Sequence, residues 1–213
     1  MNITFIAPPA SGKGTQSLKI SEEYGLVHIS TCDLLRNIQN EEIEKQLDNG
    51  LFVSDDIICK LLMERISKSD CDKGYVLDGF PRNLAQAKKY EEMLKRLNKK
   101  LGIIIVLDID KNIALNRIVG RQNCPKCGAV FNDIFPDTKS KVKGICDMCG
   151  SHLVKRDDDN AETFEKRYQT YIKETAPVID YFKDNVYHVD SSINSIYTFS
   201  QIKKIIGGVY DKY

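Results

Sequence analysis

The sequence has no excess of charge of one sign and no long apolar run. Lysine and arginine number 31 against 30 for aspartate and glutamate, so the net charge of +1 gives no reason to expect a nucleic acid or a membrane surface as partner. No stretch approaches the roughly 18 consecutive apolar residues of a membrane-spanning helix. Met1 leads almost directly into strand-like sequence, without the basic region and apolar stretch of a secretion signal. We therefore expect neither export nor a membrane partner.

Cysteine is too scarce for a disulfide scaffold. The chain has seven cysteines in 213 residues, and an odd number cannot all pair within one molecule. A reducing cytoplasm fits this usage best, and it makes clustered cysteines candidate metal ligands. The length suits one domain with a sizeable core, carrying inserts, but hardly two large domains.

Short β-rich runs alternate with longer amphipathic ones along the chain. Several of the short runs are apolar throughout, as expected of parallel strands that are buried on both faces. The alternation predicts an α/β fold with a doubly wound, parallel, five-stranded sheet and helices on both faces. The predicted strands cover residues 2–7, 27–30, 75–78, 103–109 and 186–190. The predicted helices cover residues 12–24, 55–66, 84–97, 111–121, 160–175 and 177–183, with Ser54, Asn83 and Asn160 at three of their N-termini.

Residues 122–159 interrupt this alternation. They have no sustained hydrophobic period and few apolar residues, so a piece this small needs a covalent or metal cross-link to hold its shape. Two C-x-x-C pairs lie within it, Cys124 with Cys127 and Cys146 with Cys149. The spacing matches a four-thiolate zinc site, and a glycine after each pair allows a tight turn.

Two other interpretations of the cysteines remain open. The compartment disfavours a pair of local disulfides, and the ligand type favours zinc over an iron–sulfur cluster. Four protein ligands would leave no open coordination position. We therefore expect one structural, non-catalytic zinc per chain.

The stretch APPASGKGTQ, residues 7–16, follows the first predicted strand. It holds half of the phosphate-loop pattern G-x-x-x-x-G-K-[ST], because Ala7 replaces the first glycine and Gly14 the final Ser or Thr. At a strand-to-helix turn, backbone N–H groups and the positive helix terminus favour phosphate. Lys13 would neutralise the β- and γ-phosphates, and the Thr15 hydroxyl would reach Mg²⁺. The alternative is a turn that binds nothing, and the flanking strand and helix favour the phosphate loop.

Five motifs, in order and from end to end, resemble those of the adenylate kinases. They are APPASGKGTQ, STCDLLR at 30–36, LDGFPR at 77–82, RIVGR at 117–121, and RDDD at 156–159 with Arg167 beyond. In that family the loop reads G-x-P-G-x-G-K-G-T, so Gly14 before Thr15 is normal there, whereas Ala7 and Ala10 depart from it. An alanine at either place would cost about 1–2 kcal/mol if its φ were positive. The resemblance implies reversible, Mg²⁺-dependent phosphoryl transfer, ATP + AMP = 2 ADP.

Arginine is the natural residue for such a reaction, because phosphoryl transfer needs positive charge and its planar fork engages phosphate oxygens bidentately. Arg82 follows a predicted strand and a Gly-Phe-Pro turn, where α/β sheets bind ligands. Arg117 and Arg121 are four apart in a predicted helix, which would put them on one face. Arg156 lies at the exit of the cysteine insert.

The resemblance also implies a role for individual residues. The phosphoryl group in transfer would be contacted by Lys13, Arg82, Arg121, Arg156 and Arg167. ATP would be bound by Ala10, Ser11, Gly12, Lys13, Gly14, Thr15, Arg117, Arg121, Val130, Phe131 and the backbone of Ile193. AMP would be bound by Thr31, Arg36, Leu51, Phe52, Val53, Gly79, Phe80, Pro81, Arg82, Gln86, Arg156 and Arg167. Mg²⁺ would be held through water by Asp33 and Asp78, and Cys32 replaces a usual glycine beside Thr31.

The same resemblance divides the chain into a core and two inserts. The core would comprise residues 1–29, 54–121 and 160–213, with an AMP-side helical insert at 30–53 and a zinc-stapled lid at 122–159. Between residues 36 and 50 the chain is shorter than in many long adenylate kinases. The partners would be ATP, AMP and ADP, and nothing demands an oligomer, so we expect a monomer.

Two other functions agree with parts of the sequence. A zinc module with Lys126, Lys139, Lys141 and Lys143 could bind nucleic acid, yet it has only Phe131 and Phe135 as aromatics and carries several aspartates. A kinase with UMP or CMP as acceptor would keep the fold, but those relatives usually have a short lid. The sequence favours AMP as acceptor.

Overall fold

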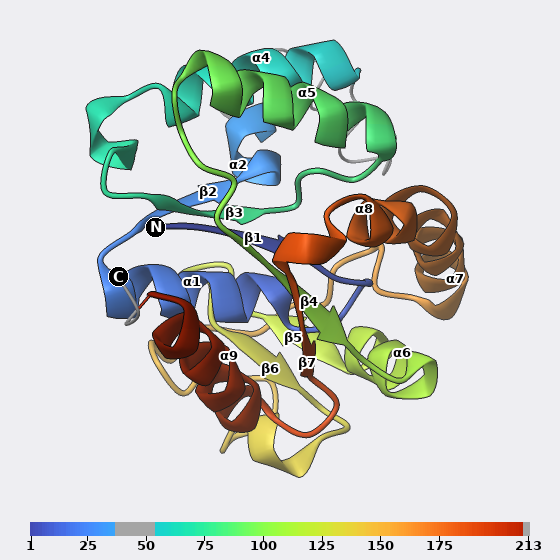
Figure 1. The fold of residues 1–213 in the computed structure, drawn as a ribbon. Coiled ribbons are helices and arrows are strands. Elements are labelled where there is room, and N and C mark those ends of the chain that lie inside the picture. The colour runs from blue at the N-terminus through green and yellow to red at the C-terminus, as the bar shows by residue number, and fades with distance from the viewer. Residues whose placement is uncertain (37–53, 211–213) are drawn as a thin grey trace.

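A computed structural model describes residues 1–36 and 54–210 of the chain (Figure 1). Its centre is a parallel five-stranded sheet in the order β2-β3-β1-β4-β7. Each strand is one that the sequence predicts, to within a residue at its end. The strands are β1 (Asn2–Ile6), β2 (Val27–Ser30), β3 (Tyr75–Asp78), β4 (Ile103–Asp108) and β7 (Val186–Asp190).

Helices cover both faces of the sheet, which confirms the doubly wound arrangement. Successive strand residues point to opposite faces. Phe5 and Ile105 pack toward one pair of helices, and Ile104 and Val106 toward the other group. On the first face lie α1 (Lys13–Tyr24) and α9 (Ser195–Tyr210), and on the second lie α4 (Asp55–Ile66), α5 (Leu84–Arg96) and α8 (Ala176–Tyr181) (Figure 1).

Side-chain caps fix where several helices begin. The Asn83 side chain accepts a hydrogen bond from Gln86 N (2.8 Å), and Asn160 does the same for Thr163 N (2.9 Å), as N-cap residues do. Ser54 caps α4 through Ile57 N. The remaining helical segments are α2 (Thr31–Arg36), α6 (Lys111–Val119), α7 (Ala161–Thr170), a π-helical turn (Tyr171–Thr175) and single 3₁₀ turns at Ser69–Cys71, Pro136–Thr138 and Lys183–Asn185.

The predicted helix over 111–121 is too long, and the shared face of Arg117 and Arg121 is wrong. The helix ends at Val119, where residues farther along the chain bond to its last carbonyls. Asn132 Nδ2 donates to the Arg117 carbonyl (2.8 Å), and Asp133 N donates to the Gly120 carbonyl (2.8 Å). Arg121 then opens a strand of the insert. That strand, β5 (Arg121–Asn123), pairs antiparallel with β6 (Val130–Asn132), a pairing that the sequence does not reveal.

Two helices, α2 and α9, are absent from the sequence-based prediction. The segment of α9 contains β-branched and aromatic residues and two glycines, which lower intrinsic helix propensity. Burial of Ile202 and Ile206 against the sheet overrides that preference. Most of the expected AMP-side insert, including Leu51, Phe52 and Val53 and the shortened stretch after residue 36, lies outside the described residues.

None of the helices in residues 1–36 and 54–210 combines the length and the apolar character needed to cross a bilayer.

Candidate functional site

Most of the predicted nucleotide-binding residues lie at one edge of the sheet. They follow the carboxyl ends of β1, β2, β3 and β7, which meet at that edge because the strands are parallel. This is the edge at which open α/β sheets bind their ligands.

The loop between β1 and α1 has the geometry of an anion site. Gly12 takes φ 86° at the start of α1, and among the described residues no side chain caps this helix and no acid lies in its first turn. Its first N–H groups are therefore available to an anion. Ser11 is buried and its hydroxyl has no hydrogen-bond partner in the described part of the chain, while Gly14 and Thr15 are exposed.

The two alanines of the loop differ in backbone conformation. Ala10 has φ 61°, in the left-handed region that disfavours a Cβ, whereas Ala7 is not among the described residues with positive φ. Strain is therefore confined to Ala10.

Lys13 lies in an ion pair with Asp78 at the end of β3. Burial, followed by the positive charge of Arg82, lowers the pKa of the Lys13 ammonium to about 7, and the nearby Cys32 sulfur opposes that shift. The Asp78 carboxylate thus holds the Lys13 ammonium at this edge of the sheet.

Two residues that sequence reasoning missed support Asp78. Ser17 Oγ lies 3.3 Å from the Asp78 Oδ2 atom and 3.1 Å from His28 Nε2. Burial lowers the pKa of His28, against the opposing charge of Asp33, so we expect a neutral imidazole at neutral pH. The second predicted Mg²⁺ residue, Asp33, is exposed on α2, near enough to act on His28.

The loop after β3 brings the predicted acceptor-side residues together. Gly79 takes φ 88°, and a Cβ there would lie 2.8 Å from the Thr31 Oγ1 atom, so only glycine fits. Its carbonyl accepts hydrogen bonds from Thr31 Oγ1 (3.1 Å) and Arg82 Nε (2.8 Å). Arg82 also lies 3.6 Å from the Cys32 sulfur. Phe80 and Pro81, joined by a cis peptide bond, are buried beneath this turn, and Arg36 is the last residue of α2.

Gln86 is almost completely buried and tied to the same loop. Its Oε1 atom accepts a hydrogen bond from Arg82 N (2.7 Å), and its Nε2 donates to the Asp55 Oδ1 atom (2.6 Å). Asp55 is a further residue that the sequence analysis did not assign to the site.

Two arginines that flank the insert, Arg121 and Arg167, are paired with aspartates at its end. Arg121 makes a bidentate ion pair with Asp159, whose carboxylate is 0% exposed, with 2.8 Å between Arg121 Nε and Asp159 Oδ2. Arg167 Nη2 donates to the Asp158 Oδ2 atom at 2.6 Å. The aspartates stand in the RDDD motif, which could have identified them, whereas Arg156 of the same motif is exposed.

The predicted ATP-side residues beyond the loop are less tightly grouped. Arg117 Nη2 donates to the Ser192 carbonyl at 3.3 Å, which places it beside the loop that carries Ile193. Ile193 is exposed, as is Val130 on β6, while Phe131 is half-buried there. Burial lowers the pKa of Arg117, and the Asp190 carboxylate counteracts that shift.

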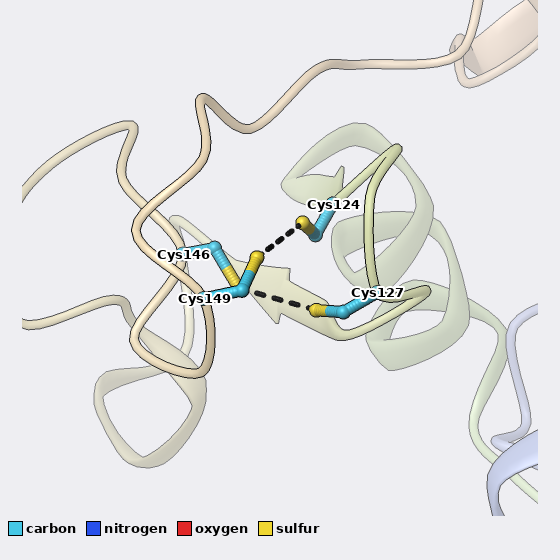
Figure 2. Close-up of side chains that lie close together, drawn as sticks. All are labelled: Cys124, Cys127, Cys146 and Cys149. Atoms are coloured by element: carbon cyan, nitrogen blue, oxygen red, sulfur yellow. Dashed lines mark hydrogen bonds between the residues drawn. The ribbon is translucent and has the colours of Figure 1, made fainter.

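The four cysteines of the insert converge, as Figure 2 shows. Their sulfurs lie within 4.8 Å of one another, with 3.4 Å between Cys124 and Cys149 and 3.5 Å between Cys127 and Cys146. All four thiols are free, so the disulfide alternative is wrong for this structure. Tetrahedral zinc with Zn–S bonds near 2.3 Å places its sulfurs roughly 3.8 Å apart. The arrangement fits a structural zinc.

Comparison with known proteins agrees with this geometry. The family model described as "Adenylate kinase" matches residues 5–187. The adenylate kinase of Archaeoglobus fulgidus is 40% identical over 214 residues, covering 97% of this chain and 98% of the relative. That of Geobacillus sp. WCH70 is 38% identical over 218 residues, covering 98% and 100%. That of Clostridium botulinum strain Hall is 39% identical over 217 residues, covering 97% and 99%.

Loss of the cysteine centre should destabilise the insert. We expect Cys124→Ser to lose the single zinc per chain and to melt about 10 °C lower, because metal binding supplies much of the folding energy of so small a module. Elemental analysis measures the zinc content, and thermal melts measure the melting temperature. Cys32→Ser, outside the centre, should keep its zinc. A metal-free preparation as stable as the untreated protein would contradict the zinc assignment.

Relief of strain at Ala10 should stabilise the protein. Ala10→Gly removes a left-handed alanine at the cost of a more flexible unfolded chain, so we expect a gain of up to about 1 kcal/mol in the free energy of unfolding. Ala7→Gly is the matched control and should lose roughly 0.5–1 kcal/mol. Denaturant titrations measure the free energy of unfolding of both variants. An equal loss of stability in the two would contradict the claim that Ala10 is strained.

Proposed function

The chain belongs to the adenylate kinase family, and on that premise we propose that it transfers the γ-phosphoryl group of ATP to AMP, giving two ADP, reversibly and with Mg²⁺. The observation that carries this proposal is that four cations, each from a separate segment, are held by polar groups of the chain itself. They are Lys13 on Asp78, Arg82 on the Gly79 carbonyl, Arg121 on Asp159 and Arg167 on Asp158.

The β1–α1 loop is the proposed donor site. Its open N–H groups and Lys13 would take the β- and γ-phosphates of ATP. Arg117, beside Ser192, and the backbone of Ile193 would border the adenine. The proposed ATP residues are Ala10, Ser11, Gly12, Lys13, Gly14, Thr15, Arg117, Arg121, Val130, Phe131 and Ile193.

The loop after β3 is the proposed acceptor site. Arg82 would turn from the Gly79 carbonyl and Cys32 to engage the AMP phosphate, with Thr31 beneath it. Gln86 would face the base. The proposed AMP residues are Thr31, Arg36, Leu51, Phe52, Val53, Gly79, Phe80, Pro81, Arg82, Gln86, Arg156 and Arg167.

Charge stabilisation is the main contribution of these residues to the reaction. The phosphoryl group in transit spreads negative charge over its equatorial oxygens, and cations fixed beforehand lower the energy of that state. Arg121 keeps N–H groups that Asp159 does not use, and those would contact the phosphates. Closure of residues 122–159 would exclude water from the γ-phosphate.

The metals have separate roles in this proposal. Zinc on the four cysteines would only hold the insert together. Mg²⁺, which prefers oxygen ligands and retains its waters, would neutralise phosphate charge, and the carboxylates of Asp33 and Asp78 suit that water shell. When Lys13 turns to phosphate, Asp78 is freed for this task. We further propose a monomer in a reducing cytoplasm, in keeping with the free thiols.

A panel of acceptors tests the function. We expect kcat/KM for AMP to exceed that for UMP, CMP and GMP by about 100-fold or more, since a site that hydrogen-bonds one base rejects others strongly. A coupled assay of ADP formation provides the measurement. Lys13→Met is the control for contaminating kinases, and its turnover should fall by about 1,000-fold with the fold intact. Preference for another monophosphate would contradict the acceptor assignment, and a fully active Lys13→Met would contradict the donor site.

A further inference from the structure

A closed polar network joins the start of α4, the cap of α5 and the loop after β3. Asp55 uses both carboxylate oxygens, since Oδ1 accepts from Gln86 Nε2 (2.6 Å) and Oδ2 accepts from Asn83 Nδ2 (3.0 Å). The Oδ1 atom of Asn83 accepts from Gln86 N (2.8 Å), and Gln86 Oε1 accepts from Arg82 N (2.7 Å). Gln86 itself is 2% exposed.

This network leaves only one orientation for the Gln86 amide. A carboxylate can only accept and a backbone N–H can only donate, so Nε2 must face Asp55 and Oε1 must face Arg82. The turned amide would set oxygen against oxygen at Asp55 and two donors against each other at Arg82. Buried polar atoms without hydrogen-bond partners cost free energy. The Gln86 amide with its oxygen and nitrogen exchanged is therefore excluded.

A fixed amide can distinguish bases that a rotating amide cannot. An amide has two acceptor lone pairs and two N–H donors, and the chain uses one of each, so one of each remains. Adenine offers the complementary pair, an N6 amino donor beside the N1 acceptor. Hypoxanthine, the base of IMP, reverses the pair, with an O6 acceptor beside an N1–H donor. A freely turning amide would fit both by exchanging its oxygen and nitrogen.

The geometry points to Asp55 as the residue that sets the base specificity of the acceptor site by locking the Gln86 amide. This inference rests on the proposed function, which places Gln86 at the AMP base. Asp55 acts through Gln86 and is a positioning residue. With its orientation fixed by Asp55, the Gln86 amide can hydrogen-bond to N6 and N1 of adenine. It cannot pair with O6 and N1–H of hypoxanthine, so IMP would leave buried donors and acceptors unpaired.

Asp55→Asn tests the lock with a side chain of the same shape. Asparagine cannot accept from both neighbouring amides, so every arrangement leaves one donor–donor contact and the turned Gln86 becomes populated. We expect the ratio of kcat/KM for AMP to that for IMP to fall about tenfold or more. The KM for ATP should stay within about twofold, because the donor site is not part of the network. A loss of stability alone would not change this ratio.

Two control variants separate this inference from the function on which it rests. Asp56→Asn changes the neighbouring exposed acid, which pairs with Lys89, and should leave the AMP/IMP ratio unchanged. Gln86→Ala should raise the KM for AMP and abolish most of the preference, and adding Asp55→Asn to it should change the ratio no further. A Gln86→Ala variant with normal AMP kinetics would contradict the acceptor site itself.

The inference is overturned if Asp55→Asn folds normally and keeps the full preference for AMP while Gln86→Ala loses it. Thermal melts establish folding. Should Asp55→Asn melt below the assay temperature, Asp55→Ser keeps a residue that suits the first turn of α4 but is too short to hold the amide. It should narrow the AMP/IMP ratio in the same way, and an unchanged ratio there would equally dismiss the role of Asp55.

Discussion

Positive charges must be gathered in one place before any phosphate arrives to balance them, and this constraint shapes the whole site. The chain meets it with its own carboxylates. Asp78 holds Lys13, and Asp159, which is completely buried, holds Arg121 through two hydrogen bonds. Leaving that carboxylate without its partner would cost several kcal/mol, so the arginine is fixed whether or not a ligand is bound. For Arg121, such positioning lets charge stabilisation act without reorganisation during the reaction.

The fold supplies the cations from segments that are far apart in the sequence. Parallel strands bring the loops after β1, β2 and β3 to one edge of the sheet, and this places Lys13 and Arg82 there, with the neutral Thr31 beside Gly79. The remaining two arginines, Arg121 and Arg167, flank the insert and pair with the aspartates at its end. Because the insert has almost no apolar core, its cysteine centre is the part that can keep it rigid, and the proposed catalytic geometry therefore depends on the zinc site.

Periodicity and motifs predicted the five strands, the phosphate loop and the cysteine centre, because each has a local signal. The structure corrected what depends on distant contacts. The end of α6 depends on Asn132 and Asp133, which bond to its last carbonyls from farther along the chain. Spacing alone therefore placed Arg117 and Arg121 wrongly on one helix face. The α9 helix forms against its own propensity through burial. Asp159 stands in the RDDD motif, which could have identified it, whereas Asp55 and His28 belong to no motif. They reach Gln86 and Ser17 only through the fold.

A crystal structure of the protein with AMP and a non-hydrolysable ATP analogue tests the central claim most directly, namely that the buried Asp159 carboxylate fixes Arg121 in place before any phosphate binds. We expect Arg121 to keep its bidentate pair with Asp159 while its remaining N–H groups contact phosphate oxygens. Lys13 should lie on the β- and γ-phosphates. A complex in which Arg121 has turned away from Asp159 to reach the phosphates would contradict the account.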